Sequence, residues 1–67
     1  MSQKLEWTKT PMMGWTKYTA VAGDVVYTIE KDDTRIFALW KDSENLAVVS
    51  SVQSAKKAAQ DDFNNAK

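Results

Sequence analysis

The last third of the chain changes its periodicity within two residues, and this change constrains the fold more than any other feature. Residues 46–49 form a short apolar run typical of a strand, whereas residues 52–63 repeat small and apolar side chains at three- and four-residue intervals. Only Ser50 and Ser51 separate the two patterns. We therefore predict a strand that leads directly into a helix.

The predicted helix has two candidate N-caps and a narrow apolar stripe. Ser50 is favoured as the cap because Gln53 follows at the spacing of a capping box, and Ser51 is the alternative. Small side chains let a helix lie close to a sheet, so we expect the helix to cover one sheet face. The stripe consists of Val52, Ala55, Ala59, Phe63 and Ala66.

Four earlier segments are rich in β-branched and aromatic residues and are separated by turn-forming residues: residues 5–10, 15–21, 25–30 and 35–40. Pro11 cannot donate an amide hydrogen bond and should end the first strand, and Gly14 predicts a positive backbone dihedral or a close approach in the connection after it. The links are as short as those of hairpins, so neighbouring strands should pair antiparallel. The predicted fold is α+β: an antiparallel β-meander of four to five short strands with one C-terminal helix packed on one face.

Length and composition exclude several classes of protein. A chain of 67 residues makes one domain, residues 1–67, with a small core. It contains no cysteine and no histidine, so disulfides are excluded, and a zinc or transition-metal site is disfavoured. We predict no metal site and no cofactor.

Charge and hydropathy predict a soluble cytoplasmic protein. Nine basic side chains balance nine acidic ones, which disfavours a general attraction to nucleic acid or to an anionic membrane. No apolar run approaches the ~20 residues of a membrane span, and the first residues lack the apolar region of a signal peptide.

Catalysis is the function that the residues support least. The chain has no histidine or cysteine nucleophile or base, no glycine-rich phosphate loop and no G-x-S-x-G motif. Two acidic pairs occur, of which Asp32 and Asp33 fall in a predicted turn and Asp61 and Asp62 on a predicted solvated helix face. We therefore predict a protein that is not an enzyme and has no catalytic residues.

The strands carry more large apolar side chains than one helix can cover. In residues 35–40, Phe37 and Leu39 point to one face, whereas Ile36, Ala38 and Trp40 point to the other. Exposing several such side chains is unfavourable and usually indicates a surface that binds a partner. We therefore predict an apolar surface on the sheet face that the helix leaves uncovered.

Aromatic residues with neighbouring cations are the candidates for partner binding, because such residues carry much of the energy of protein interfaces. Trp15 and Tyr18 are three positions apart and should face opposite sides of the sheet. The alternative for any single aromatic is a place in the core, and a homodimer could also use a second apolar face. The predicted partner-binding residues are Trp15, Lys17, Tyr18, Arg35, Trp40 and Lys41.

A small sheet with exposed aromatics can also stack nucleic-acid bases, but it then needs concentrated positive charge. Here Lys9, Lys17, Arg35 and Lys41 are diluted by four acidic residues: Asp24, Glu30, Asp32 and Asp33. Nucleic acid is therefore a less favoured partner than protein.

Three segments resemble short bacteriophage and prophage proteins that end in an Ala-Lys-x-x-Ala-Gln helix after a small antiparallel sheet. They are residues 27–30, 37–40 and 51–62, and the resemblance covers roughly residues 15–63. Residues 29–32 and 55–59 are also similar to antitoxins of the HicB type. The proline- and glycine-containing segment of those antitoxins is missing after Trp40, so no toxin-binding residue is carried over.

The phage resemblance implies a small non-catalytic protein, made during infection, that binds and occludes a host protein or protein complex. Phage proteins of this kind include inhibitors of host defence nucleases such as anti-CRISPRs. Two alternatives remain: a small nucleic-acid-binding regulator that uses the sheet aromatics, and an oligomeric structural or assembly subunit whose second apolar face is its contact.

Overall fold

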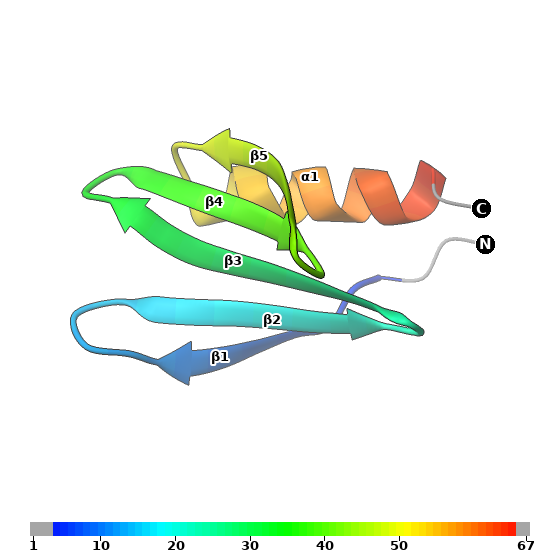
Figure 1. The fold of residues 1–67 in the computed structure, drawn as a ribbon, viewed down its shortest axis with the longest axis horizontal. Coiled ribbons are helices and arrows are strands. Elements are labelled where there is room, and N and C mark those ends of the chain that lie inside the picture. Colours follow the sequence, from blue (N-terminus) through cyan, green and yellow to red (C-terminus); the bar gives the residue numbers. More distant parts are fainter. Residues whose placement is uncertain (1–3, 66–67) are drawn as a thin grey trace.

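The computed structural model describes residues 4–65 and confirms the predicted order of strands and helix (Figure 1). The elements are β1 (Trp7–Pro11), β2 (Thr16–Ala22), β3 (Val25–Asp33), β4 (Ile36–Lys41), β5 (Glu44–Val49) and α1 (Val52–Asn65). Each strand pairs antiparallel with its neighbours in the chain, so the order in the sheet is β1-β2-β3-β4-β5. The fold is a five-stranded antiparallel meander with one C-terminal helix.

Two strands extend further than the sequence pattern predicts. β3 continues to Asp33, with an irregularity between Lys31 and Asp33, so the following turn contains only Thr34 and Arg35. β5 already begins at Glu44, next to a two-residue turn, where Asp42 has a φ of 55°. Backbone pairing therefore continues through polar residues that look like turn formers in the sequence.

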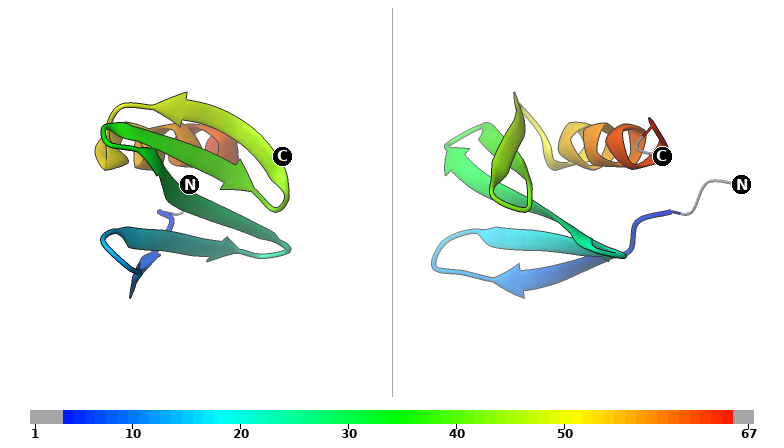
Figure 2. Two further views of the ribbon diagram at one scale, coloured as in Figure 1. Left: turned by 60° about the vertical axis from the view of Figure 1, so that its left-hand side comes forward. Right: turned by 45° about the vertical axis from the view of Figure 1, so that its right-hand side comes forward.

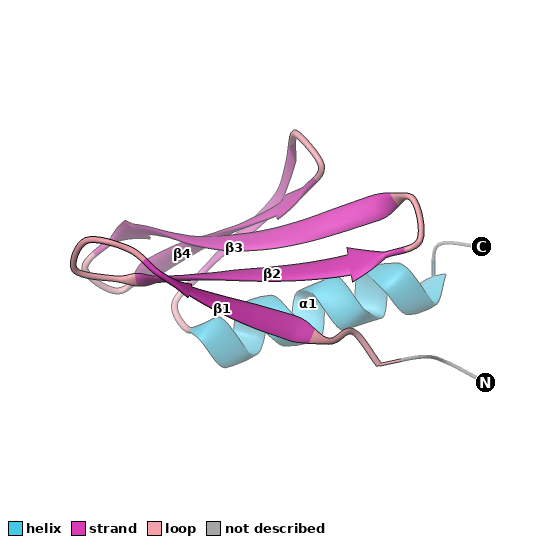
Figure 3. Cartoon of the chain, turned by 90° about the horizontal axis from the view of Figure 1, so that it is seen from below, coloured by secondary structure: helices cyan, strands magenta, loops and turns pink. Residues whose placement is uncertain are grey.

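The helix α1 lies on one face of the sheet, as predicted (Figure 3). It packs mainly against β3, β4 and β5, and both views of Figure 2 show it beside these strands. The opposite face of the sheet is not covered by any described element.

The core lies between the helix and the middle of the sheet. Ile29 and Leu39 are fully buried there, and burying each such side chain is favourable by about 1.5–3 kcal/mol. Ala55 and Ala59 are the buried residues of the helix, so its closest approach to the sheet is made by alanines, as predicted. Ala66, the last residue of the predicted stripe, lies outside the described residues.

The N-cap of α1 is Ser51 rather than the favoured Ser50. Ser51 Oγ accepts a hydrogen bond from the backbone N–H of Ser54 at 3.1 Å, and the Ser51 and Ser54 hydroxyls are 3.0 Å apart. Because the helix begins at Val52, a cap at Ser50 would be one residue too early. Within residues 4–65, Gln53 makes no hydrogen bond to the Ser50 backbone, so the predicted capping box does not form.

Asp62 does not lie on a solvated helix face, which corrects the prediction for the second acidic pair. Its Oδ2 accepts a hydrogen bond from the Tyr27 hydroxyl at 2.8 Å and lies 3.2 Å from Lys41 Nζ. Asp61, by contrast, is exposed. The helix therefore directs one carboxylate of the pair onto the sheet, where it meets two strands.

Candidate interaction surface

The sheet face opposite α1 is the predicted uncovered surface and is called the open face below. Strand register places one row of polar and aromatic side chains across it, because directly paired residues lie on the same face. The row runs from β1 to β5 through Thr8, Thr19, Thr28, Trp40 and Asn45. Trp40 is the one large apolar side chain in this row.

The predicted division of β4 between two faces is confirmed. Phe37 and Leu39 belong to the core beneath the helix. On the open face, Ile36 is exposed and Trp40 is half-buried, yet Ala38 between them is only 7% exposed. Since no helix covers this face, neighbouring side chains on the sheet itself must shield Ala38.

Trp15 and Trp40 are among the side chains that surround Ala38. Both indoles line a hollow of about 200 Å³ whose other lining residues include Ala38 and Glu30. Each tryptophan is half-buried, so one part of its surface packs on the sheet and the remainder faces solvent. An indole held in this way is a rigid apolar anchor of the kind that protein interfaces use.

A tight turn fixes the position of Trp15 immediately before β2. The Trp15 carbonyl accepts a hydrogen bond from the backbone N–H of Met12 at 2.8 Å. Gly14 has the predicted positive φ, at 80°, a conformation that side chains with a Cβ rarely adopt. Trp15 therefore depends on Gly14 for its place beside Trp40.

A second hollow, of about 310 Å³, lies on the other side of Trp40. It is lined by Lys17, Thr28, Glu30, Trp40, Asp42 and Ser43. Trp40 and Glu30 line both hollows, so the surface is organised around these two neighbouring side chains of β4 and β3.

The structure brings together three of the six predicted partner-binding residues. Trp15 and Trp40 line one hollow of the open face, and Lys17 joins Trp40 at the other. Arg35 is exposed in the β3–β4 turn. These four residues are therefore on the open face or at its end.

The other two predicted residues lie on the helix side of the sheet. Tyr18 packs against the core, and Lys56 Nζ lies 4.9 Å from the centre of its ring, a cation–π contact. Lys41 forms the ion pair with Asp62. Both side chains therefore contact α1 and belong to the junction between helix and sheet.

Sequence reasoning missed four lining residues of the first hollow: Glu30, Lys31, Asp32 and Ala38. Glu30 and Asp32 entered the prediction only as negative charges that dilute a basic surface. The signal that could have identified Glu30 is alternation, because Glu30 and Thr28 are two positions apart on one strand face, and Thr28 pairs with Trp40.

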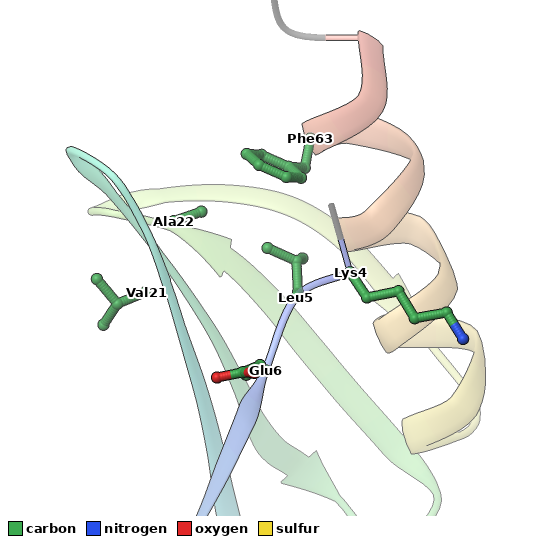
Figure 4. Close-up of a pocket in the computed structure, with 6 residues that line it drawn as sticks. All are labelled: Lys4, Leu5, Glu6, Val21, Ala22 and Phe63. Carbon is green, nitrogen blue, oxygen red and sulfur yellow. The ribbon is translucent and has the colours of Figure 1, made fainter. Parts of the chain in front are cut away.

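A separate hollow of about 480 Å³ lies where the N-terminal segment meets the end of the helix (Figure 4). Leu5, Ala22 and Phe63 project toward one another there, whereas Val21 points away from it. The backbone N–H of Leu5 donates a hydrogen bond to Gln60 Oε1 at 2.8 Å and attaches this segment to α1. We interpret the hollow as the seam of that attachment, lined by polar as well as apolar side chains.

The described residues contain no group of three or more side chains that could hold a metal ion. Within residues 4–65, no helix is long and apolar enough to cross a membrane. Comparison of the chain with models of protein families, with curated proteins and with solved structures finds no match.

Proposed function

We propose that this is a small non-catalytic protein that binds a host protein through the open face and occludes it. The observation that carries the proposal is the pair of half-buried tryptophans, Trp15 and Trp40, on the sheet face without a helix. The resemblance to short phage proteins suggests the class of partner: a host protein or complex, with a defence nuclease complex as the specific candidate.

The size of the surface is adequate for such a partner. A standard interface buries about 800 Å² on each side, about one-sixth of the 4895 Å² that this protein exposes. Exposed aliphatic side chains extend the apolar area around the tryptophans, with Val48 58% exposed beside Ala38. A rigid sheet also loses little conformational entropy on binding, which favours affinity.

Charge favours protein over nucleic acid as the partner. The two hollows beside Trp40 contain three acidic residues, Glu30, Asp32 and Asp42, against the cations Lys17 and Lys31. A surface that stacks bases must also attract phosphates, and these carboxylates would repel them.

Affinity purification with tagged variants tests the proposal. Wild-type protein should retrieve a bacterial protein or complex, and Trp15→Ala and Trp40→Ala should each reduce retrieval at least tenfold. The tryptophan changes also remove side chains that surround Ala38, so a second variant that keeps this packing is needed. Val48→Glu is that variant: Val48 is exposed, so the change should block docking without unfolding the sheet. Lys57→Ala, on the exposed side of α1, is the control and should retrieve as wild type.

If the protein occludes its partner, it should also inhibit the activity of the retrieved complex. If it is a nuclease, adding wild-type protein should lower its cleavage rate, and adding Trp40→Ala should not. Equal retrieval by all variants would contradict the proposal. Recovery of nucleic acid alone, with an affinity that falls steeply as salt is added, would favour the alternative of a nucleic-acid-binding regulator. A stable oligomer that the tryptophan changes dissociate would favour the assembly subunit.

A further inference from the structure

Glu30 is placed unusually for a carboxylate. It is half-buried in the middle of β3, pairs directly with Ala38, and lines the hollows on both sides of Trp40. Among residues 4–65, its carboxylate makes no hydrogen bond and no ion pair. Partial burial of a charge is unfavourable unless a partner compensates it, so this carboxylate is suited to receive a positively charged group.

The charged side chains around Glu30 also favour a positively charged ligand. The first hollow is lined by two carboxylates, Glu30 and Asp32, and by one lysine, Lys31. The second hollow is lined by the carboxylates Glu30 and Asp42 and by the lysine Lys17, so acidic side chains outnumber basic ones in both hollows. The local field around Trp40 is therefore negative.

The flanking indoles restrict the chemistry of the ligand. A guanidinium group stacks on an indole face and donates paired hydrogen bonds to a carboxylate, whereas an ammonium group acts as a point charge. The hollow between Trp15 and Trp40, at about 200 Å³, is smaller than the ~300–1,000 Å³ of pockets for whole small molecules, and its size suits one side chain.

We propose that the hollow between Trp15 and Trp40 is a socket for an arginine side chain of the bound protein, with Glu30 as its counter-charge. The inference rests on the proposed function, because it names the chemistry by which the open face recognises its partner. Trp15 and Trp40 supply stacking surfaces, Ala38 forms the floor, and Glu30 supplies the acceptor oxygens.

Titration with a single amino-acid analogue tests the socket without any partner. Nα-acetyl-arginine amide is added to the full chain while NMR follows the indole N–H resonances. Those of Trp15 and Trp40 should shift saturably, and that of Trp7, which packs against the core on the helix side, should not. The citrulline analogue has the same shape without the charge and should give at most a tenth of the affinity.

Variants isolate the role of the carboxylate. Glu30→Gln should weaken binding of the arginine amide about tenfold, whereas Lys57→Gln should leave it unchanged. Lys17→Gln should strengthen binding of the arginine amide slightly, because the change removes a competing cation. The proposal is overturned if no saturable shift occurs, if citrulline binds equally well, if Trp7 shifts with the other two, or if Glu30→Gln binds as wild type.

The two proposals can fail separately. If the tryptophan variants lose the protein partner while Glu30→Gln binds both partner and arginine amide normally, the socket is wrong and the binding surface stands. If the arginine amide binds as described but the tryptophan variants retain the partner, the socket stands as a site and the proposed function is wrong.

Discussion

The hydroxyl of Tyr27 donates a hydrogen bond to Asp62 Oδ2 at 2.8 Å and thereby joins the middle of the sheet to the last turns of the helix. Tyr27 is 1% exposed, and the same Asp62 oxygen lies 3.2 Å from Lys41 Nζ. A buried hydroxyl needs such a partner, because leaving it unsatisfied would cost much of the energy gained by burying the ring. This contact helps keep α1 on one face and the other face open.

We expect Tyr27→Phe to lower the free energy of unfolding by about 1–2 kcal/mol, since it removes a hydrogen bond to a charged acceptor and leaves the ring in place. Urea denaturation followed by circular dichroism measures the change. Tyr18→Phe is the matched control: the Tyr18 hydroxyl makes no hydrogen bond within the described part of the chain. Equal destabilisation by the two variants would contradict the assigned role of Tyr27.

Stability should fall at high pH because of the same residue. Burial, the hydrogen bond to Asp62 and the negative charges of Asp62 and Asp42 raise the pKa of Tyr27 from 10.0 to about 12. The folded state therefore holds this proton more tightly than the unfolded chain. The stabilisation is complete below about pH 10 and is lost as the pH rises to about 12, an effect of roughly 2–3 kcal/mol. Urea midpoints across this range should fall less steeply for Tyr27→Phe than for wild type.

Ser51→Ala should destabilise the protein by about 1 kcal/mol, because it leaves the backbone N–H of Ser54 without its cap. Ser50→Ala, one residue earlier, should change stability by no more than about 0.5 kcal/mol. Thermal or urea unfolding of both variants compares the two candidate caps directly. A larger effect at Ser50 would contradict the assignment of Ser51 as the cap and would favour the predicted capping box of Ser50 and Gln53.

Gly14→Ala should cost about 1–2 kcal/mol because the alanine would have to adopt a φ near 80°. There is space for the added Cβ, with no heavy atom within 4 Å of it, so the cost comes from backbone conformation. Asn tolerates this conformation better, and Gly14→Asn should be closer to wild type. The Trp15 indole resonance should move more in the alanine variant, which reports the placement of Trp15.

Ala59→Leu should destabilise the protein by about 1–3 kcal/mol, because Ala59 is fully buried where the helix meets the sheet and has no room for a larger side chain. Lys57→Leu places the same side chain on the exposed side of α1 and is the control. Urea denaturation distinguishes them. Similar stability for the two variants would show that the helix does not lie as close to the sheet as described.

The amino-acid pattern was sufficient for the elements and for the division of the sheet into two faces. Side-chain alternation in β4 separates Phe37 and Leu39 from Ala38 and Trp40, and short links require antiparallel neighbours. These are local properties, so they can be read along one strand or across one turn. The alanine stripe of α1 is local in the same sense.

Tertiary structure decided which residues far apart in the sequence meet. Trp15 precedes β2 and Trp40 lies in β4, and both strands are neighbours of β3, so the two indoles line one hollow. Asp62 meets Tyr27 because the helix returns across the sheet. Tyr18 and Lys41 looked like surface binding residues, yet their contacts are with Lys56 and Asp62 of the helix. Periodicity assigns a side chain to a face, but only the packing of helix on sheet determines which face is covered and which is left without a covering element.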